Sequence, residues 1–193
     1  MKNLIIDSIK SSVAVKTDIL NDLTLIDKIQ DIVEHIIHSY RNGGKVLFCG
    51  NGGSAADAQH LAAELSGRFY YDRPPLSAEA LHVNTSFLTA VANDYSFDEV
   101  YARMVKATGI KGDILIGIST SGNSKNILRA FEEATVKGMI TIALTGESGG
   151  LLKSKSQILI NIPSIDTARI QESHIMIGHI ICQLVEKELF PRL

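Results

Sequence analysis

The sequence has few of the residues that mark disulfide-rich, membrane-spanning or nucleic-acid-binding proteins. It contains no Trp and only two Cys, Cys49 and Cys182, which lie far apart and outside any CxxC or His/Cys metal spacing. We therefore expect two reduced, buried thiols in a cytoplasmic protein. A formal net charge of −2 gives no basic field that would attract nucleic acid. No run of about 18 uncharged apolar residues exists, so we expect no membrane span.

Linkers are missing as well. The chain has only four Pro, and no low-complexity segment divides its 193 residues. An apolar content of 45% and a charged content of 21% are typical of a globular protein with a sizeable core. We expect a single domain over residues 1–193, with an N-terminal helical segment at 1–42 and an α/β core with a C-terminal helix at 43–193.

Short apolar runs alternate with amphipathic segments along the core. The runs at 46–49, 114–118, 139–144 and 158–162 predict buried strands, and 80–83 predicts a further short one. Helical spacing of apolar residues predicts helices at about 54–65, 86–92, 97–106, 126–137 and 167–188. This alternation indicates an open parallel sheet with helices on both faces. Ligands in such sheets bind beyond the carboxyl ends of the strands, near the switch in strand order.

The two ends of the chain are unusually apolar for helices that only cover a sheet. Residues up to about Arg41 follow a helical pattern, and residues 167–188 are apolar on several sides. We expect the helical face at 23–37 to pack against another subunit or another long helix, and the C-terminal helix to be buried nearly all round. The apolar positions are Leu4, Ile5, Ile9 and Val13, then Leu23, Ile26, Ile29, Ile32, Val33, Ile36 and Ile37, and at the C-terminal end Ile170, Ile175, Met176, Ile177, Ile180, Ile181, Leu184 and Val185.

A hydroxyl-rich loop follows the predicted strand at 114–118. Ser119, Thr120, Ser121 and Ser124 lie within six residues, together with Gly122, and a helix follows. Hydroxyls and free backbone N–H groups beside a helix N-terminus suit a phosphate ester. The loop has no Lys, which argues against the nucleoside triphosphate P-loop. An ordinary polar turn with a capping Ser is the alternative.

A second strand–loop–helix unit precedes it. The loop is glycine-rich at residues 50–53, and Ser54 with Asp57 predicts a capping box that starts a helix. Because both loops follow strands of the same parallel sheet, they are expected to face one pocket.

Polar side chains recur on one face of each of two predicted helices. His60, Glu64 and Arg68 are four residues apart, and Gln171 and His179 are two helical turns apart. A surface ladder of charges on the first helix and a core histidine on the second are the alternatives. If the helices meet, the set can bind a divalent ion or carry out metal-free proton transfer, and the spacing alone does not choose.

Several of these segments together resemble one known family. They are GNGGSAADAQH at 50–60, AEL at 63–65, RF at 68–69, RPPL at 73–76, ND at 93–94, STSGNS at 119–124, and ARIQE at 168–172 with His179. On these motifs, which span nearly the whole chain, the protein resembles the phosphoheptose isomerase family of sugar isomerase (SIS) domain proteins. The resemblance implies a flavodoxin-like SIS fold, an open parallel sheet flanked by helices.

The resemblance also implies an activity and a metal. The implied reaction converts D-sedoheptulose 7-phosphate into D-glycero-D-manno-heptose 7-phosphate, the first step of bacterial ADP- or GDP-heptose synthesis for lipopolysaccharide or capsule. Glu64 would move the proton between C1 and C2, and His179 would be its acid partner. The implied cofactor is one Zn²⁺ per subunit, with no nucleotide, and its ligands would be His60, Glu64, Gln171 and His179.

Substrate contacts and assembly are implied in the same way. Family members are homotetramers with active sites between subunits, without nucleic-acid or membrane partners. Ser119, Thr120, Ser121 and Ser124 would hold the phosphate. The rest of the substrate would contact Asn51, Gly52, Gly53, Ser54, Glu64, Arg68, Asn93, Asp94 and Gln171.

Two other functions are compatible with such a chain. A non-catalytic SIS-domain adaptor that binds a replication initiator protein resembles the isomerases in its loops but lacks the acid/base pair. This chain has Glu64, Ser121 and His179 together, which favours the enzyme, because an adaptor has no chemical need for the acid/base pair. A sugar-phosphate sensor of a transcription regulator is disfavoured, because the sequence has no DNA-binding segment or basic patch.

Overall fold

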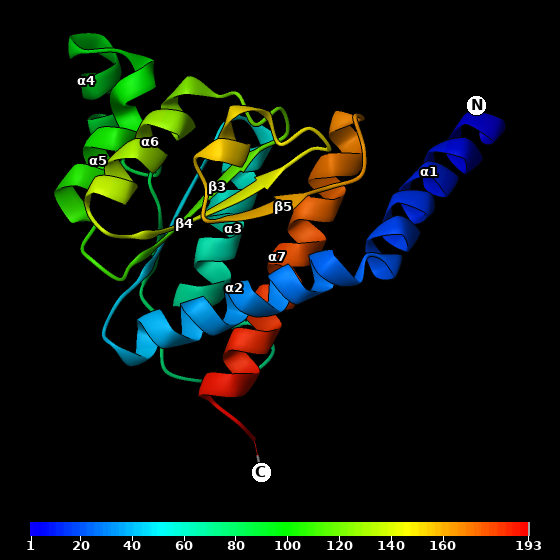
Figure 1. Ribbon diagram of the computed structural model, residues 1–193, viewed down its shortest axis with the longest axis horizontal. Helices are drawn as coiled ribbons and strands as arrows, with labels where there is room; N and C mark the ends of the chain where they lie inside the picture. The colour runs from blue at the N-terminus through cyan, green and yellow to red at the C-terminus, as the bar shows by residue number, and fades with distance from the viewer. Residues whose placement is uncertain (193) are drawn as a thin grey trace.

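Five short apolar strands form one parallel sheet, as the alternating pattern predicts. The computed structural model describes residues 1–192, and Figure 1 shows the sheet at its centre. The strands are β1 (Val46–Gly50), β2 (Ala78–Ala80), β3 (Ile114–Ser119), β4 (Ile140–Thr145) and β5 (Ile158–Asn161), in the order β2-β1-β3-β4-β5. This is the flavodoxin-like order, in which the chain reverses direction across the sheet between β1 and β3.

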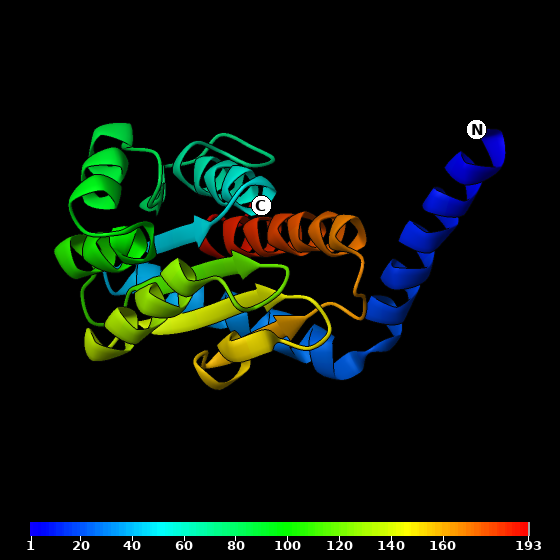
Figure 2. The ribbon, with the colours of Figure 1, turned by 90° about the horizontal axis from the view of Figure 1, so that it is seen from above.

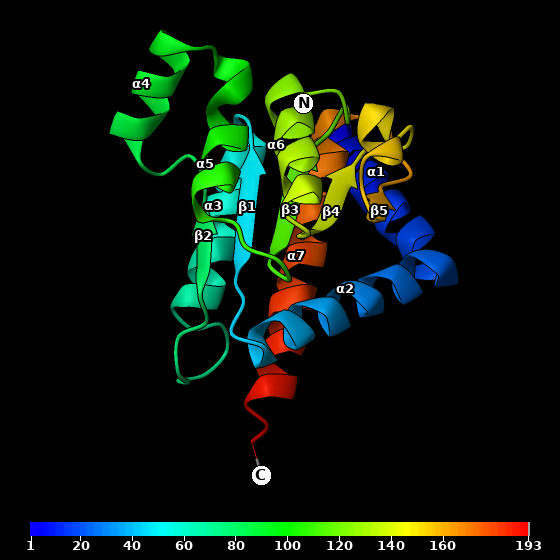
Figure 3. The same ribbon diagram turned by 60° about the vertical axis from the view of Figure 1, so that its left-hand side comes forward.

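Helices cover both faces of this sheet (Figures 1 and 3). One face is covered by α2 (Leu23–Arg41), α3 (Gly53–Ser66) and α7 (Thr167–Leu189), and the other by α4 (Thr85–Asp94), α5 (Val100–Thr108) and α6 (Lys125–Val136). Short 3₁₀ turns lie at Phe97–Glu99 and Gly150–Ser154. Alternate residues of each strand enter the two apolar cores: Phe48 packs with α3 and α7, whereas Leu47 packs with α5 and α6.

Three local predictions need correction. The strand expected at 80–83 is Ala78–Ala80, because its register is set by pairing with Val46–Phe48 of β1, and the chain turns at Leu81 and His82. The capping box is wrong: α3 starts one residue earlier, after Gly52, and Ser54 is buried in its first turn. The helix expected at 97–106 begins as the 3₁₀ turn and continues as α5.

The N-terminal segment is two helices, α1 (Lys2–Asn21) and α2, divided at Asp22, whose carboxylate accepts a hydrogen bond from Leu25 N. Figure 2 shows α1 pointing away from the rest of the molecule. Its predicted apolar face is exposed: Leu4, Ile5, Ile9 and Val13 are each more than half exposed. Only Val15 and Ile19 of α1 are buried.

Candidate functional site

The glycine loop and the hydroxyl loop leave the sheet side by side at its carboxyl edge. They follow β1 and β3, which are paired with each other up to Gly50 and Ile118. This is the switch point of the strand order, so the structure confirms that both loops lie where ligands bind in such folds. In the glycine loop, Gly52 has a φ of +55°, a conformation that favours glycine. No side chain of residues 1–192 caps the helix that follows it.

The hydroxyl loop is shaped by contacts among its own residues and with the next loop. Ser119 Oγ and Ser124 Oγ are 3.0 Å apart, and Ser121 Oγ accepts a hydrogen bond from Asn123 N. Gly122 has a φ of +66°, and a Cβ there would collide with the Gly149 carbonyl. Beside the loop lies a pocket of about 490 Å³, lined by Thr120, Ser121 and Asn123, by residues 146–148, and by Ser164, Ile165, Thr167 and Ile170.

The amide side chains of Asn51 and Asn126 connect the glycine loop to the start of α6, directly after the hydroxyl loop. Asn51 Nδ2 donates to Asn126 Oδ1 and Asn126 Nδ2 donates to Asn51 Oδ1, both at 2.9 Å. Asn126 lies in the first turn of α6 and is 2% exposed. The buried Tyr101 hydroxyl, from α5, donates to the Gly50 carbonyl at the end of β1. The side chain of Asn51 therefore holds the glycine loop against the hydroxyl loop.

A carboxylate and two imidazoles meet between α3 and α7. His60 Nε2 lies 3.3 Å from Glu64 Oε1 and 3.0 Å from His179 Nε2. One ligand atom from each of the three residues lies within 4.8 Å of the others. His179 is half-buried, so the structure does not match the core-histidine alternative. The two helices that carry these side chains, α3 and α7, therefore lie side by side.

The meeting depends on a close approach of the two helices. Leu61 and Leu65 lie on the face of α3 that packs into the core, and they are 2% and 1% exposed. Leu61 packs on Gly178, where a Cβ would lie 2.5 Å from Leu61 Cδ1 and 2.6 Å from Cδ2. Because Leu61 follows His60 and Gly178 precedes His179, this contact sets the distance between the two imidazoles.

The donor atoms fit a divalent metal ion such as Zn²⁺. Ligand atoms at 2.0–2.2 Å from a tetrahedral zinc lie about 3.3 Å from one another. The distances of 3.0 and 3.3 Å from His60 Nε2 to its two neighbours have that size. Two imidazoles and a carboxylate are also a common zinc donor set. The same groups form an acid/base array without a metal.

A second carboxylate lies one turn before His60 on α3. Burial raises the pKa of Asp57 above its ordinary value, and the nearby His60 and His179 partly oppose this shift. Asp57 is therefore a partly desolvated carboxylate beside the two imidazoles.

The remaining predicted residues are spread around these features. Gln171 lies against Gly53, where a Cβ would be 2.7 Å from its Nε2. It precedes His179 by eight residues, about 12 Å of helix rise, so within one chain its amide lies beside the glycine loop. Arg68 is exposed just after α3. Asn93 and Asp94 are exposed at the end of α4, where Asn93 Nδ2 donates to Asp94 Oδ1.

His174 and Asn126 show what the sequence does and does not reveal about this region. His174 lies on the same helix as Gln171 and His179 but is fully buried, with its Nε2 3.0 Å from the Thr145 carbonyl. Asn126 was not predicted as a site residue. The available signal was a polar side chain at the start of an apolar helix face, directly after the hydroxyl loop.

The family model for the SIS domain matches residues 13–146 of the chain. Among curated relatives, the phosphoheptose isomerase of Clostridium acetobutylicum is 55% identical over 190 residues, which cover 98% of this chain and 97% of that protein.

Solved structures give the same result. The phosphoheptose isomerase of Neisseria gonorrhoeae is 41% identical, with a TM-score of 0.90 over 96% of this chain and 98% of that one. A phosphoheptose isomerase from Francisella tularensis is 40% identical, with a TM-score of 0.92 over 96% of this chain and 97% of that one.

Proposed function

The chain belongs to the SIS-domain family, and from this membership we propose that it is a phosphoheptose isomerase. The reaction converts D-sedoheptulose 7-phosphate into D-glycero-D-manno-heptose 7-phosphate, which opens heptose synthesis for a bacterial lipopolysaccharide or capsule. The observation that carries the proposal is 55% identity to a phosphoheptose isomerase over nearly the full length of both chains. The Glu64, His60 and His179 cluster supports catalysis over a non-catalytic adaptor.

In the proposed mechanism, Glu64 is the base. Its carboxylate removes a proton from C1 of the ketose while His179 donates a proton to the C2 oxygen, which gives an enediol. Glu64 then returns the proton to C2, and the O1 proton passes to the imidazole, which leaves an aldehyde at C1. The geometry supports these roles, because the half-buried Glu64 carboxylate and the His179 imidazole lie on either side of His60 Nε2, at 3.3 and 3.0 Å, so a base and an acid are close together.

The hydroxyl loop is the proposed phosphate site, with Ser119, Thr120, Ser121 and Ser124 as donors. The adjacent pocket of about 490 Å³ and the N-terminus of α6 support this assignment. The rest of the substrate would contact Asn51, Gly52, Gly53, Ser54, Glu64, Arg68, Asn93, Asp94 and Gln171. The join between Asn51 and Asn126 supports a shared pocket, because it holds the two loops in one arrangement.

One Zn²⁺ per subunit is part of the proposal. His60, Glu64 and His179 would hold it; Gln171, the fourth expected ligand, lies beside Gly53 and does not reach these three within one chain. When bound, the ion supplies Lewis-acid polarisation of the substrate oxygens. The test is a metal analysis of the purified protein: one zinc per chain, lost in a His60→Ala variant, is expected. A protein that retains no divalent metal and gains no turnover when zinc is added would overturn this part.

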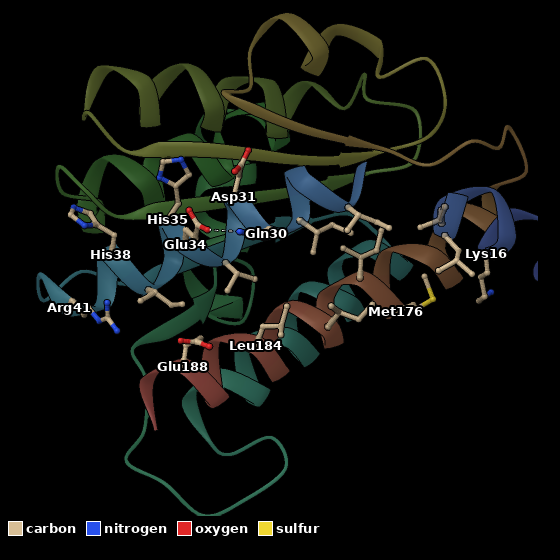
Figure 4. Close-up of a pocket in the computed structure, with 18 residues that line it drawn as sticks. Lys16, Gln30, Asp31, Glu34, His35, His38, Arg41, Met176, Leu184 and Glu188 are labelled. Atoms are coloured by element: carbon tan, nitrogen blue, oxygen red, sulfur yellow. Dashed lines mark hydrogen bonds between the residues drawn. The ribbon is translucent and has the colours of Figure 1, made fainter. Parts of the chain in front are cut away.

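A homotetramer with active sites between subunits is proposed from the unpartnered apolar surface. A groove of about 1140 Å³ lies between α1, α2 and α7, and Met176 and Leu184 point into it from α7 (Figure 4). The exposed Leu4, Ile5 and Ile9 of α1 extend this surface. We expect light scattering to give a mass about four times the 21.0 kDa of one chain. A monomer at micromolar concentration would contradict the proposal.

A cytoplasmic location completes the proposal. Its support is that Cys49 and Cys182 are both free and buried, as thiols are in a reducing compartment. None of the helices formed by residues 1–192 is both long and apolar enough to cross a bilayer.

The activity is tested directly with purified protein and D-sedoheptulose 7-phosphate in D₂O. Proton NMR should detect the aldose phosphate with deuterium at C2, because the proton carried by a carboxylate exchanges with solvent. Glu64→Gln keeps the shape of the side chain but cannot accept a proton, so it should lose turnover while substrate binding persists in equilibrium dialysis. Absence of product from the wild type, with and without added Zn²⁺, would refute the isomerase.

A further inference from the structure

A buried ion pair joins the segment after α3 to the last turns of α7. Arg73 Nε lies 3.1 Å from Glu186 Oε1, and the two side chains are 2% and 1% exposed. Desolvation offsets most of the attraction in such a pair, so burial alone does not explain why an ion pair stands here. The hydrogen bonds that Arg73 and Glu186 make with the backbone indicate the structural role of the pair.

The guanidinium of Arg73 caps the carboxyl end of α3. Its Nη1 donates to the carbonyls of Leu65 at 2.7 Å and Gly67 at 3.1 Å, and its Nη2 donates to the Glu64 carbonyl at 2.8 Å. These last carbonyls of a helix have no partner within the helix. Arg73 therefore fixes the backbone of the residue that carries the proposed base.

The carboxylate of Glu186 fixes the chain between α3 and Arg73. It accepts hydrogen bonds from Phe69 N at 2.9 Å and Tyr70 N at 2.8 Å. Burial by itself would raise the pKa of the Glu186 carboxyl, but these N–H groups and Arg73 hold that pKa below its ordinary value. The Phe69 ring, positioned in this way, packs against the His179 ring with centroids 5.6 Å apart.

These bonds form the last of three contacts along α3 and α7. The first joins Gly53 to Gln171, the second Leu61 to Gly178, and the third is the Arg73–Glu186 pair. Glu64 lies between the second and third contacts. With the third removed, the carboxyl end of α3 would lose its polar attachment to α7.

We propose that Arg73 and Glu186 are positioning residues, which hold Glu64 on α3 in register with His179 on α7. Neither touches the reacting atoms. The catalytic consequence of this inference rests on the proposed isomerase function, whereas the geometric consequence does not.

The test replaces the whole pair. In Arg73→Met/Glu186→Leu both charges are gone, so no buried charge is left unpaired and the fold is expected to persist. We expect kcat to fall about a hundredfold and KM to stay within about threefold of the wild-type value. The reason is that the base is misplaced while the hydroxyl loop, the proposed phosphate site, is unchanged. The apparent Zn²⁺ affinity, measured by competition with a chromogenic chelator, should fall about tenfold or more.

A matched pair lies near the amino ends of the strands. Lys45 Nζ is 2.7 Å from Asp113 Oδ2, and the buried Asp113 carboxylate also accepts from Lys45 N and Ile110 N. Lys45→Met/Asp113→Leu therefore removes a similar ion pair far from the site. We expect it to keep the kcat and Zn²⁺ affinity of the wild type per folded molecule, with folded fractions measured by circular dichroism.

A single variant, Arg73→Lys, covers the case in which the double variant fails to fold. Lysine keeps the charge but lacks the planar fork that reaches several carbonyls, so kcat should again fall with little change in KM. Wild-type kcat and Zn²⁺ affinity in Arg73→Lys, or equal losses in the two double variants, would overturn the proposal. If the wild type does not isomerise the sugar, the proposed function fails, and the change in Zn²⁺ affinity alone decides this inference.

Discussion

Gly178→Ala is expected to separate stability from activity. A Cβ at this position would lie 2.5 and 2.6 Å from the two Cδ atoms of Leu61, whereas ordinary carbon contacts begin at about 3.5 Å. Leu61 is 2% exposed and packed in the core, so any shift of its side chain would displace buried neighbours. We expect α3 and α7 to move apart by about 1 Å, which would lengthen the 3.0 Å contact between His60 and His179 to about 4 Å.

The expected loss of folding stability is smaller than the expected increase in the activation barrier. Overpacking costs about 1–3 kcal/mol, and the better helix propensity of Ala returns about 1 kcal/mol. The net loss of about 0–2 kcal/mol would lower the melting temperature by no more than about 8 °C in a chain of this length. A misplacement of about 1 Å in the site costs about a hundredfold in turnover, or about 2.7 kcal/mol in the activation barrier.

Turnover of sedoheptulose 7-phosphate and thermal melting, measured on the same preparation, provide the assay. Leu61→Val removes the two Cδ atoms, so Leu61→Val/Gly178→Ala should recover most of the turnover although both changes affect the core. Wild-type turnover in Gly178→Ala, or no recovery in the double variant, would show that this close approach does not set the geometry of the site.

Three further predictions concern the loops and the core. Ser119→Ala/Ser124→Ala should raise KM, by about 1–3 kcal/mol of binding energy for each charge-assisted hydrogen bond lost, and an unchanged KM in steady-state kinetics would place the phosphate elsewhere. Asn126→Ala leaves the Asn51 amide unpaired, so KM should rise and the free energy of unfolding in urea should fall by about 1–3 kcal/mol; an unchanged KM would show that the join does not shape the pocket. Burial lowers the pKa of His174 to about 4, against a backbone bond that raises it, so between pH 6.5 and 4 the unfolded chain binds a proton that the folded chain does not. The free energy of unfolding should therefore fall by up to about 3 kcal/mol as the pH is lowered through this range, and the slope should flatten in His174→Gln; equal slopes in urea titrations would contradict the burial argument.

The sequence predicts the local features of this fold well wherever a run of residues is favourable in only one environment. Apolar runs such as 114–118 can only be buried strands, and Leu61 and Leu65 can only face the core of an amphipathic helix. The edge strand was misplaced because Leu81 looks like a strand residue, yet pairing with β1 ends at Ala80. The end of β2 is set by its pairing with β1, a distant segment of the chain, so the local sequence around Leu81 does not show where the strand ends.

The site shows the same division. His60 and Glu64 were found because four-residue spacing places them on one face of one helix. Asn126, Arg73 and Glu186 were not assigned roles, since each acts through a partner more than 70 residues away or through backbone carbonyls. Tertiary hydrogen bonds of this kind have no periodicity, and only the folded chain brings their two ends together.

The parallel packing of α3 against α7 has a consequence for how the sequence can change in length. The contacts at Gln171, Gly178 and Glu186 are spaced about two turns apart along α7, and each meets a different part of α3 or of the segment that follows it. Adding or deleting one residue between them would rotate everything beyond it by about 100°, so that a later contact point would face the wrong way. The span from 171 to 186 should therefore accept no insertion or deletion, even at positions away from the three contact points, while loops elsewhere on the surface can vary in length.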